Sequence, residues 1–231
     1  MNLLVESLLA VLYPPECPCC GATLTRGEKP MCLACRLRLP LTGFADSPAN
    51  NDLIDKLNGL VPIERATAYF TYRRDSPQAR LIHAMKYHGR PSIGRDLARE
   101  YARTILSTGF FNGIDAIVPV PLNFWRHCSR GYNQSAHIAR GLSDVTSIAV
   151  IDAMSARRHK SQTRLGADSR LSAAKGIFTA GKDALKGVAH VLLVDDICTT
   201  GATLHACAEA IHSAAPDVKI SVLVLASTAL S

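Results

Sequence analysis

The sequence has no apolar run that approaches the roughly 20 residues of a membrane-spanning helix, and it has no internal repeat and no low-complexity segment. Its first residues, MNLLVESLLAVLY, lack lysine and arginine, include Glu6, and are not followed by a small-residue cleavage site. We therefore expect no membrane span and no secretory signal. We interpret this stretch as an amphipathic helix of a cytoplasmic protein.

Positive charge is what the chain has in excess. The formal net charge is +7, and between Arg73 and Lys175 there are 17 lysines or arginines against 7 aspartates or glutamates. Such a basic middle favours an anionic partner, either a phosphate-rich small molecule or a nucleic acid. A solvated basic surface is the alternative that charge by itself leaves open.

Five of the 8 cysteines lie in the short stretch ECPCCGATLTRGEKPMCLACR. Cys17 and Cys20 form one C-x2-C pair, and Cys32 and Cys35 form a second. Two such pairs offer four thiolates to one tetrahedral metal ion, which predicts a structural zinc site. Two alternatives stay open: Cys19 replaces one of its neighbours as a ligand, or the cysteines are reduced and bind no metal.

From residue 65 onward, short apolar runs alternate with segments of helical pattern. Strands are expected at 65–72, 114–122, 147–151, 188–194 and 219–227, and helices after Ser76, around 97–106, in the second half of 123–143 and at 201–213. This alternation predicts an α/β fold, a mainly parallel sheet covered by helices on both faces. We divide the chain into a helix and cysteine module at 1–40, a connector at 41–64 and the α/β domain at 65–231.

The stretch VLLVDDICTTGAT, residues 191–203, predicts a ligand site. Asp195 and Asp196 follow the expected strand at its carboxyl end, where parallel sheets bind ligands. The two carboxylates can accept hydrogen bonds from vicinal hydroxyls or help to hold magnesium. The loop behind them, made of Thr199, Thr200, Gly201, Ala202 and Thr203, offers hydroxyls and helix-start N–H groups to a phosphate. A sugar phosphate satisfies both halves.

The same stretch resembles the phosphoribosyl-pyrophosphate (PRPP) loop of type I phosphoribosyltransferases. This resemblance implies the type I phosphoribosyltransferase fold for residues 65–231. It also implies that Asp195 and Asp196 contact the ribose 2′ and 3′ hydroxyls, and that Thr199 to Thr203 bind the 5′-phosphate.

Further stretches resemble the ComF family of competence-associated, phosphoribosyltransferase-like proteins. They are IVPVPL, RGYNQ, Gln162 with Arg170, GIF at 176–178, MKY at 85–87 and the N-terminal cysteines. The resemblance implies a zinc module joined to a phosphoribosyltransferase domain. It also implies a role in the uptake or processing of single-stranded DNA.

A departing pyrophosphate needs positive charge near its oxygens, and Arg126, Arg130 and Lys86 are the candidates. The spacing R-H-C-S-R departs from the family pattern, so which arginine meets pyrophosphate stays open. Magnesium is expected to bridge pyrophosphate and ribose oxygens. The polar stretch from Arg157 to Arg170 is either a loop that closes over the site or a surface loop.

Two functions remain open at this point. In the first, the protein is an enzyme in which a nitrogen base attacks C1 of PRPP and pyrophosphate leaves. In the second, it is a non-catalytic module that senses PRPP or a nucleotide and binds single-stranded DNA or a DNA-translocating helicase. We predict a zinc-containing, PRPP-binding protein that acts in DNA uptake or processing, and whether it transfers a phosphoribosyl group stays open.

Overall fold

A five-stranded parallel sheet forms the centre of the computed structural model, which describes residues 15–59, 61–87, 89–122, 131–156 and 177–229. The strand order is β1-β7-β6-β2-β3, and every neighbouring pair is parallel. The strands are β1 (Arg65–Thr71), β2 (Ala116–Pro119), β3 (Ala149–Val150), β6 (His190–Cys198) and β7 (Lys219–Ser227). A separate antiparallel pair consists of β4 (Met154–Ala156) and β5 (Phe178–Ala180).

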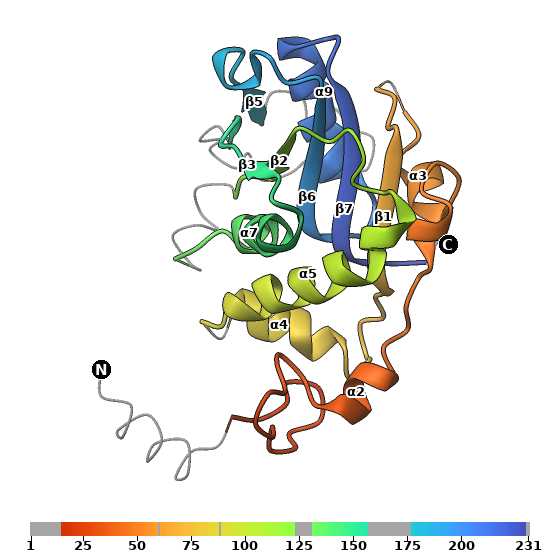
Figure 1. Cartoon of the computed structure of the whole chain (residues 1–231), viewed down its shortest axis with the longest axis vertical. Helices are drawn as coiled ribbons and strands as arrows, with labels where there is room; N and C mark the ends of the chain where they lie inside the picture. Colours follow the sequence, from red (N-terminus) through yellow and green to blue (C-terminus); the bar gives the residue numbers. More distant parts are fainter. Residues whose placement is uncertain (1–14, 60, 88, 123–130, 157–176, 230–231) are drawn as a thin grey trace, which may run out of the picture.

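Helices cover both faces of the sheet, as predicted (Figure 1). One face is covered by α4 (Ala79–Tyr87), α5 (Ser92–Ile105) and α7 (Gln134–Thr146), and the other by α3 (Asp52–Leu57) and α9 (Ala202–Ala214). The side chains of β6 alternate between these two layers. Leu192 and Val194 join the core with α5 and α7, whereas Val191 and Leu193 join the core with α9. A strand buried on both faces reads as a continuous apolar run because neither side meets water.

The segment predicted as a connector, residues 41–64, contains structure of its own. It includes a short 3₁₀ helix, η1 (Phe44–Asp46), and the helix α3, whose Leu53 and Leu57 are buried in the core beneath β1. The side chain of Asn51 begins α3 by accepting hydrogen bonds from the N–H groups of Leu53 and Ile54. The domain boundaries themselves stay a prediction.

The cysteine segment lies next to α4 and below it in Figure 1, and its last cysteine, Cys35, lies in the short helix α2 (Leu33–Leu37). Cys17, Met31 and Cys32 are buried in the same apolar cluster as Leu81 and Met85 of α4. The segment therefore has no separate core, and its packing is continuous with that of the α/β domain.

Two further expectations concern helices. The predicted helix after Ser76 begins at Ala79, whose N–H donates to the Ser76 hydroxyl at 3.3 Å. The predicted N-terminal helix lies outside the described residues. Among the helices that the structure describes, none is both long enough and apolar enough to cross a membrane.

Candidate functional site

The acidic pair lies within β6 and not after it, which corrects the predicted strand end at residue 194. Pairing with β7 continues to Cys198, which lies opposite Ser227. On the other side β2 ends at Pro119, opposite Val194. Asp195 and Asp196 therefore lie where β6 extends beyond its shorter neighbour, and within the described residues this edge of the strand pairs with no other strand.

Asp195 is held by two short hydrogen bonds. Its Oδ1 accepts from the Ser135 hydroxyl at 2.9 Å and from the N–H of Asp196 at 2.8 Å. Burial is the largest cause that raises the pKa of Asp195, to about 7, and the charge of Asp196 adds to it, while the two hydrogen bonds and Lys86 oppose it. Asp195 is therefore an oriented acceptor whose charge is disfavoured until a cation or a hydroxyl donor arrives.

Asp196 is buried and pairs with Lys86. The Lys86 ammonium lies 2.9 Å from Asp196 Oδ1, and the two side chains are 16% and 9% exposed. Lys86 comes from the last turn of α4, more than a hundred residues earlier in the chain. The structure thus brings this predicted pyrophosphate ligand to the acidic pair, at the open edge of β6.

The loop Thr199–Thr203 connects β6 to α9. Thr199 and Thr200 are exposed, and α9 begins at Ala202. Gly201 has a φ of 79°, and a Cβ built there would lie 3.1 Å from the backbone oxygen of Lys56. Only glycine adopts this backbone without strain, so the residue fixes the turn that starts the helix.

The acidic pair and part of the loop open into one pocket of about 370 Å³. Its lining includes Lys86, Asp195, Asp196, Thr199 and Thr203. Ala202 also lines it, whereas Thr200 and Gly201 do not. An apolar wall lies beside these groups and is made of Val120, Pro121, Leu122, Ile177, Phe178 and Ile197.

The described residues of the motif RGYNQ that follow Gly131 pack around this pocket. The Tyr132 hydroxyl donates to the Met85 carbonyl at 2.6 Å, in the last turns of α4. Asn133 donates to the Val120 carbonyl at 3.0 Å and accepts from the N–H of Ser135, which starts α7. Tyr132 thus links the segment before α7 to α4.

The sequence marked Gln134 only as the last residue of the motif RGYNQ, without a role, and did not single out Ser135. Gln134 is 1% exposed and lines the pocket, and Ser135 orients Asp195. The position of Ser135 directly after this motif is the only signal in the sequence that pointed to it. Arg126, Arg130 and the stretch from Arg157 to Arg170 lie outside the described residues, so their roles stay predictions.

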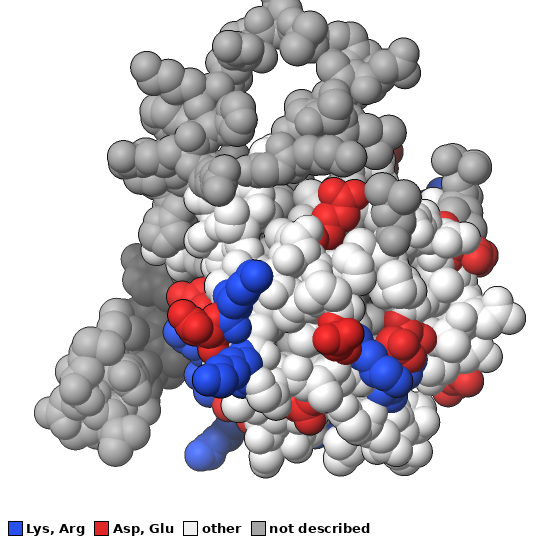
Figure 2. All heavy atoms as spheres, turned by 90° about the horizontal axis from the view of Figure 1, so that it is seen from above, with Lys and Arg blue, Asp and Glu red and all other residues white. Residues whose placement is uncertain are grey.

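Some of the positive charge in the described part of the chain is paired with carboxylates. Arg95 and Arg99 share the carboxylate of Asp144 at 2.8 and 2.7 Å, and Lys86 pairs with Asp196. Figure 2 shows one face of the molecule, on which basic side chains lie beside acidic ones. The described part of that face therefore carries charges of both signs.

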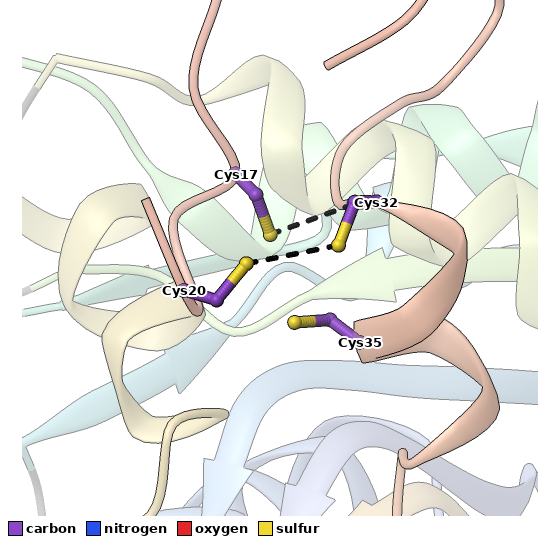
Figure 3. A group of neighbouring side chains, drawn as sticks. All are labelled: Cys17, Cys20, Cys32 and Cys35. Carbon is purple, nitrogen blue, oxygen red and sulfur yellow. Dashed lines mark hydrogen bonds between the residues drawn. The ribbon is translucent and has the colours of Figure 1, made fainter. Parts of the chain in front are cut away.

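The four predicted cysteine ligands come together. The sulfur atoms of Cys17, Cys20, Cys32 and Cys35 all lie within 4.8 Å of one another and point toward a common centre (Figure 3). The distance between the sulfurs of Cys20 and Cys32 is 3.7 Å. A tetrahedral zinc ion with Zn–S bonds of about 2.3 Å spaces its sulfurs about 3.8 Å apart. The cluster therefore fits a metal ion, and its all-thiol composition favours zinc.

The surroundings of the cluster shift the pKa values of its cysteines in different directions. Although burial opposes ionisation, backbone N–H groups of Cys32, Cys20 and Cys19 lower the pKa of Cys17 to about 6. Burial and the neighbouring thiols raise the pKa of Cys35, which a bound cation would reverse. Cys19 is buried but is not one of the four clustered sulfurs, and its carbonyl accepts from Arg80 of α4 at 3.2 Å.

Comparison with known proteins agrees with the predicted family. The chain is 31% identical over 138 residues to the DNA utilization protein YhgH of Salmonella typhi, and the match covers 55% of this chain and 58% of that protein. It is 32% identical over 135 residues to competence protein F of Haemophilus influenzae, covering 56% and 59%. The chain thus spans less than two thirds of the length of these relatives, and the similarity confirms the resemblance to the ComF family.

Among solved structures, the chain is similar to the glutamine PRPP amidotransferase of B. subtilis (TM-score 0.37, 17% identity, covering 59% of this chain and 26% of that one). It is also similar to the adenine phosphoribosyltransferase of Saccharomyces cerevisiae (TM-score 0.36, 15% identity, covering 59% and 69%).

Residues 92–229 match the phosphoribosyl transferase domain family. The matched region runs from the start of α5 to the end of β7, so it includes the acidic pair, the loop behind it and four strands of the parallel sheet. With this fold and this match together, the chain belongs to the phosphoribosyl transferase domain family.

Proposed function

We propose that the pocket beside β6 binds PRPP. Asp195 and Asp196 accept hydrogen bonds from the ribose hydroxyls, and the loop Thr199–Thr203 receives the 5′-phosphate. One observation carries the proposal: the acidic pair and three residues of the loop, Thr199, Ala202 and Thr203, line a single pocket beside β6, in a domain of this family. A ribose phosphate presents vicinal hydroxyls and a phosphate at a fixed spacing, so one molecule can satisfy both.

The pyrophosphate end of PRPP requires positive charge. Lys86 is the described candidate, because its ammonium already lies at the acidic pair, and Arg126 and Arg130 remain the candidates from the loop before α7. Carboxylate oxygens are ligands that magnesium accepts, so Asp195 and Asp196 fit a magnesium ion that keeps several waters. When bound, the ion would add positive charge where the pyrophosphate oxygens become more negative.

If the protein transfers the phosphoribosyl group, a nitrogen lone pair of the acceptor forms the new bond at C1. The bond from C1 to the pyrophosphate oxygen breaks, and its electron pair leaves with pyrophosphate. The protein then contributes orientation of the ribose by the acidic pair and electrostatic stabilisation of the leaving group. A zinc ion held by the four cysteines would take no part in this step.

Calorimetric titration of PRPP with magnesium tests the binding proposal. We expect the native protein to bind, and the double variant Asp195→Asn/Asp196→Asn to bind at least about tenfold more weakly, since each lost charge-assisted hydrogen bond costs more than about 1 kcal/mol. The exposed pair Asp152→Asn/Asp217→Asn is the matched control. Absence of binding to the native protein would overturn the proposal. Binding would justify a screen of acceptor bases for pyrophosphate release.

We also propose that the protein acts in DNA uptake or processing, with single-stranded DNA or a DNA-translocating helicase as its partner. The names of its relatives support this role. In this chain, a surface hollow of about 600 Å³ beside the cysteine segment is lined by Arg80, His83 and Arg90, with Glu16 as the acidic member. Within the described residues, neither arginine forms an ion pair, so both can meet phosphates.

Binding of a labelled single-stranded oligonucleotide across a salt series tests direct contact with DNA. Affinity that falls steeply with salt is expected, because phosphate neutralisation releases counterions. The variant Arg80→Ala/Arg90→Ala should bind more weakly and with a smaller salt slope than the control Arg140→Ala. A flat salt series would contradict direct DNA binding and leave the helicase as the partner to test by co-purification.

A further inference from the structure

Lys56 stands out among the residues outside the pocket, because it lies in the stretch predicted as a connector and yet reaches the end of the central strands. It belongs to α3, on the face of the sheet opposite α4 and α5. Its ammonium donates to the hydroxyl of Thr228 at 2.9 Å, to the Thr228 carbonyl and to the Ser227 hydroxyl at 3.4 Å. The side chain is half-buried, so these oxygens replace much of its hydration.

Thr228 in turn contacts the loop Thr199–Thr203, the proposed binding site of the 5′-phosphate. Its hydroxyl donates to the carbonyl of Thr199, the first residue of the loop, at 3.1 Å. Its N–H donates to the Cys198 carbonyl at 3.0 Å. A continuous series of hydrogen bonds thus runs from Lys56 through Thr228 to Thr199.

The backbone of Lys56 meets the same loop a second time. Its carbonyl oxygen lies against Gly201, at 3.1 Å from the place where a Cβ would stand, and Leu57 packs beside it. The position of α3 is fixed by the buried Leu53 and Leu57 and by the Asn51 amide, which donates to the Ala66 carbonyl of β1 at 3.0 Å. Both Thr199 and Gly201 therefore rest on one well-anchored helix.

We propose that Lys56 is a positioning residue for the binding of the 5′-phosphate: through Thr228 it fixes the Thr199 carbonyl, and with it the conformation of the loop Thr199–Thr203. This inference rests on the proposed function of that loop. A phosphate cradle depends on backbone N–H groups held in one orientation, so the residue that fixes the loop controls affinity without touching the ligand. The positive charge of Lys56 at this end of the sheet also favours an anion.

The test compares Lys56→Met with the exposed control Lys186→Met, using three ligands in magnesium buffer: PRPP, ribose 5-phosphate and pyrophosphate. We expect Lys56→Met to weaken the binding of PRPP and of ribose 5-phosphate about tenfold or more. The binding of pyrophosphate should change less than about twofold, because we expect pyrophosphate to bind beside Lys86 and not at the loop Thr199–Thr203. The melting temperature of each variant reports whether the fold is kept.

Variants of Thr228 provide a second, independent test of the inference. Thr228→Val removes the hydroxyl at nearly constant shape and should weaken ribose 5-phosphate as Lys56→Met does, whereas Thr228→Ser should bind as the native protein does. The double variant Lys56→Met/Thr228→Val should be no weaker than either single variant, because both break the same series of contacts.

The outcomes separate this inference from the proposed function. If the native protein binds none of the three ligands, the proposed function fails and the inference fails with it. If the native protein binds PRPP and Lys56→Met binds it equally well, the inference alone is overturned. It is also overturned if Lys56→Met loses pyrophosphate to the same extent as ribose 5-phosphate, or if the effects of the two single variants add.

Discussion

At the scale of single residues, the pocket is organised by the ion pair of Lys86 with Asp196 and by the Ser135 hydroxyl, which orients Asp195. Asp196 pairs with Lys86, while Asp195 accepts hydrogen bonds, within the described residues, from the Ser135 hydroxyl and a backbone N–H. The two adjacent carboxylates therefore have different partners before any ligand binds. Burial raises the pKa of Asp195, and a cation or a ribose hydroxyl at this carboxylate would lower it.

The raised pKa of Asp195 predicts that the variant Asp195→Asn is more stable than the native protein at alkaline pH. The pKa of Asp195 is raised to about 7 in the folded protein, so the folded state holds this proton more tightly than the unfolded state does. The associated stability is present at low pH and is lost as the pH rises from about 4 through about 7. Asparagine stays neutral, so the variant should melt above the native protein at pH 8, by about 2–4 °C for each kcal/mol gained.

Thermal melts of both proteins in magnesium-free buffer at pH 5 and pH 8 measure this effect. The difference in melting temperature should be larger at pH 8. Asp217→Asn removes an exposed carboxylate and should show the same small difference at both values. Equal differences for Asp195→Asn at pH 5 and pH 8 would show that this carboxylate is ionised throughout.

At the scale of elements, α4 connects the two sites of the molecule. Its buried face packs with the cysteine segment, its Arg80 donates to the Cys19 carbonyl, and its last turn places Lys86 at Asp196. The Met85 carbonyl also receives the Tyr132 hydroxyl. One helix thus fixes the cation of the pocket, the start of α7 and the position of the metal cluster relative to the sheet.

The helices α5 and α7 approach each other closely at Gly141. A Cβ at Gly141 would lie 2.4 Å from the Arg95 carbonyl oxygen and 2.8 Å from the Ala98 Cβ. Gly141→Ala should therefore force the two helices apart and lower the free energy of unfolding by about 1–3 kcal/mol, despite the better helix propensity of alanine.

Urea unfolding of Gly141→Ala measures this cost. Gly181→Ala is the matched control, because its Cβ meets only the Ala184 Cβ at 3.9 Å. A Gly141→Ala protein as stable as the native one would mean that α5 and α7 slide apart without loss of packing. Because Ser135, which donates to Asp195, lies in the first turn of α7, the separation should also weaken PRPP binding.

At the scale of the whole molecule, the cysteine cluster is part of the main core. Cys17, Cys19 and Cys32 are buried in one cluster with residues of α4, α5 and α7. A metal that holds the four thiolates together would therefore stabilise the α/β domain as well as the short segment that binds it.

Removal of the metal should lower the melting temperature of the entire protein in a single transition. Titration with a strong chelator, followed by calorimetric melting, checks this expectation, and elemental analysis reports the metal lost. Added zinc should restore the transition, while added magnesium should not, because four thiolates suit a soft cation. A chelated protein that melts as before, with its metal gone, would show that the thiol cluster needs no ion to support the core.

Much of this structure follows from the sequence by itself. The alternation of apolar runs and helical segments determined the parallel α/β fold, because a strand buried on both faces and an amphipathic helix are local patterns. The sequence also predicted the chemistry of the two sites, because each site is built from contiguous motifs: the two C-x2-C pairs, the acidic pair and the loop Thr199–Thr203.

Only the tertiary structure decided how these parts meet. The extension of β6 to Cys198 depends on pairing with β7, the orientation of Asp195 depends on a hydroxyl 60 residues away, and the contact of Lys56 with Thr228 spans 172 residues. Such contacts leave no periodic or contiguous trace in the chain, because side chains distant in sequence become neighbours only when the sheet and its helices pack.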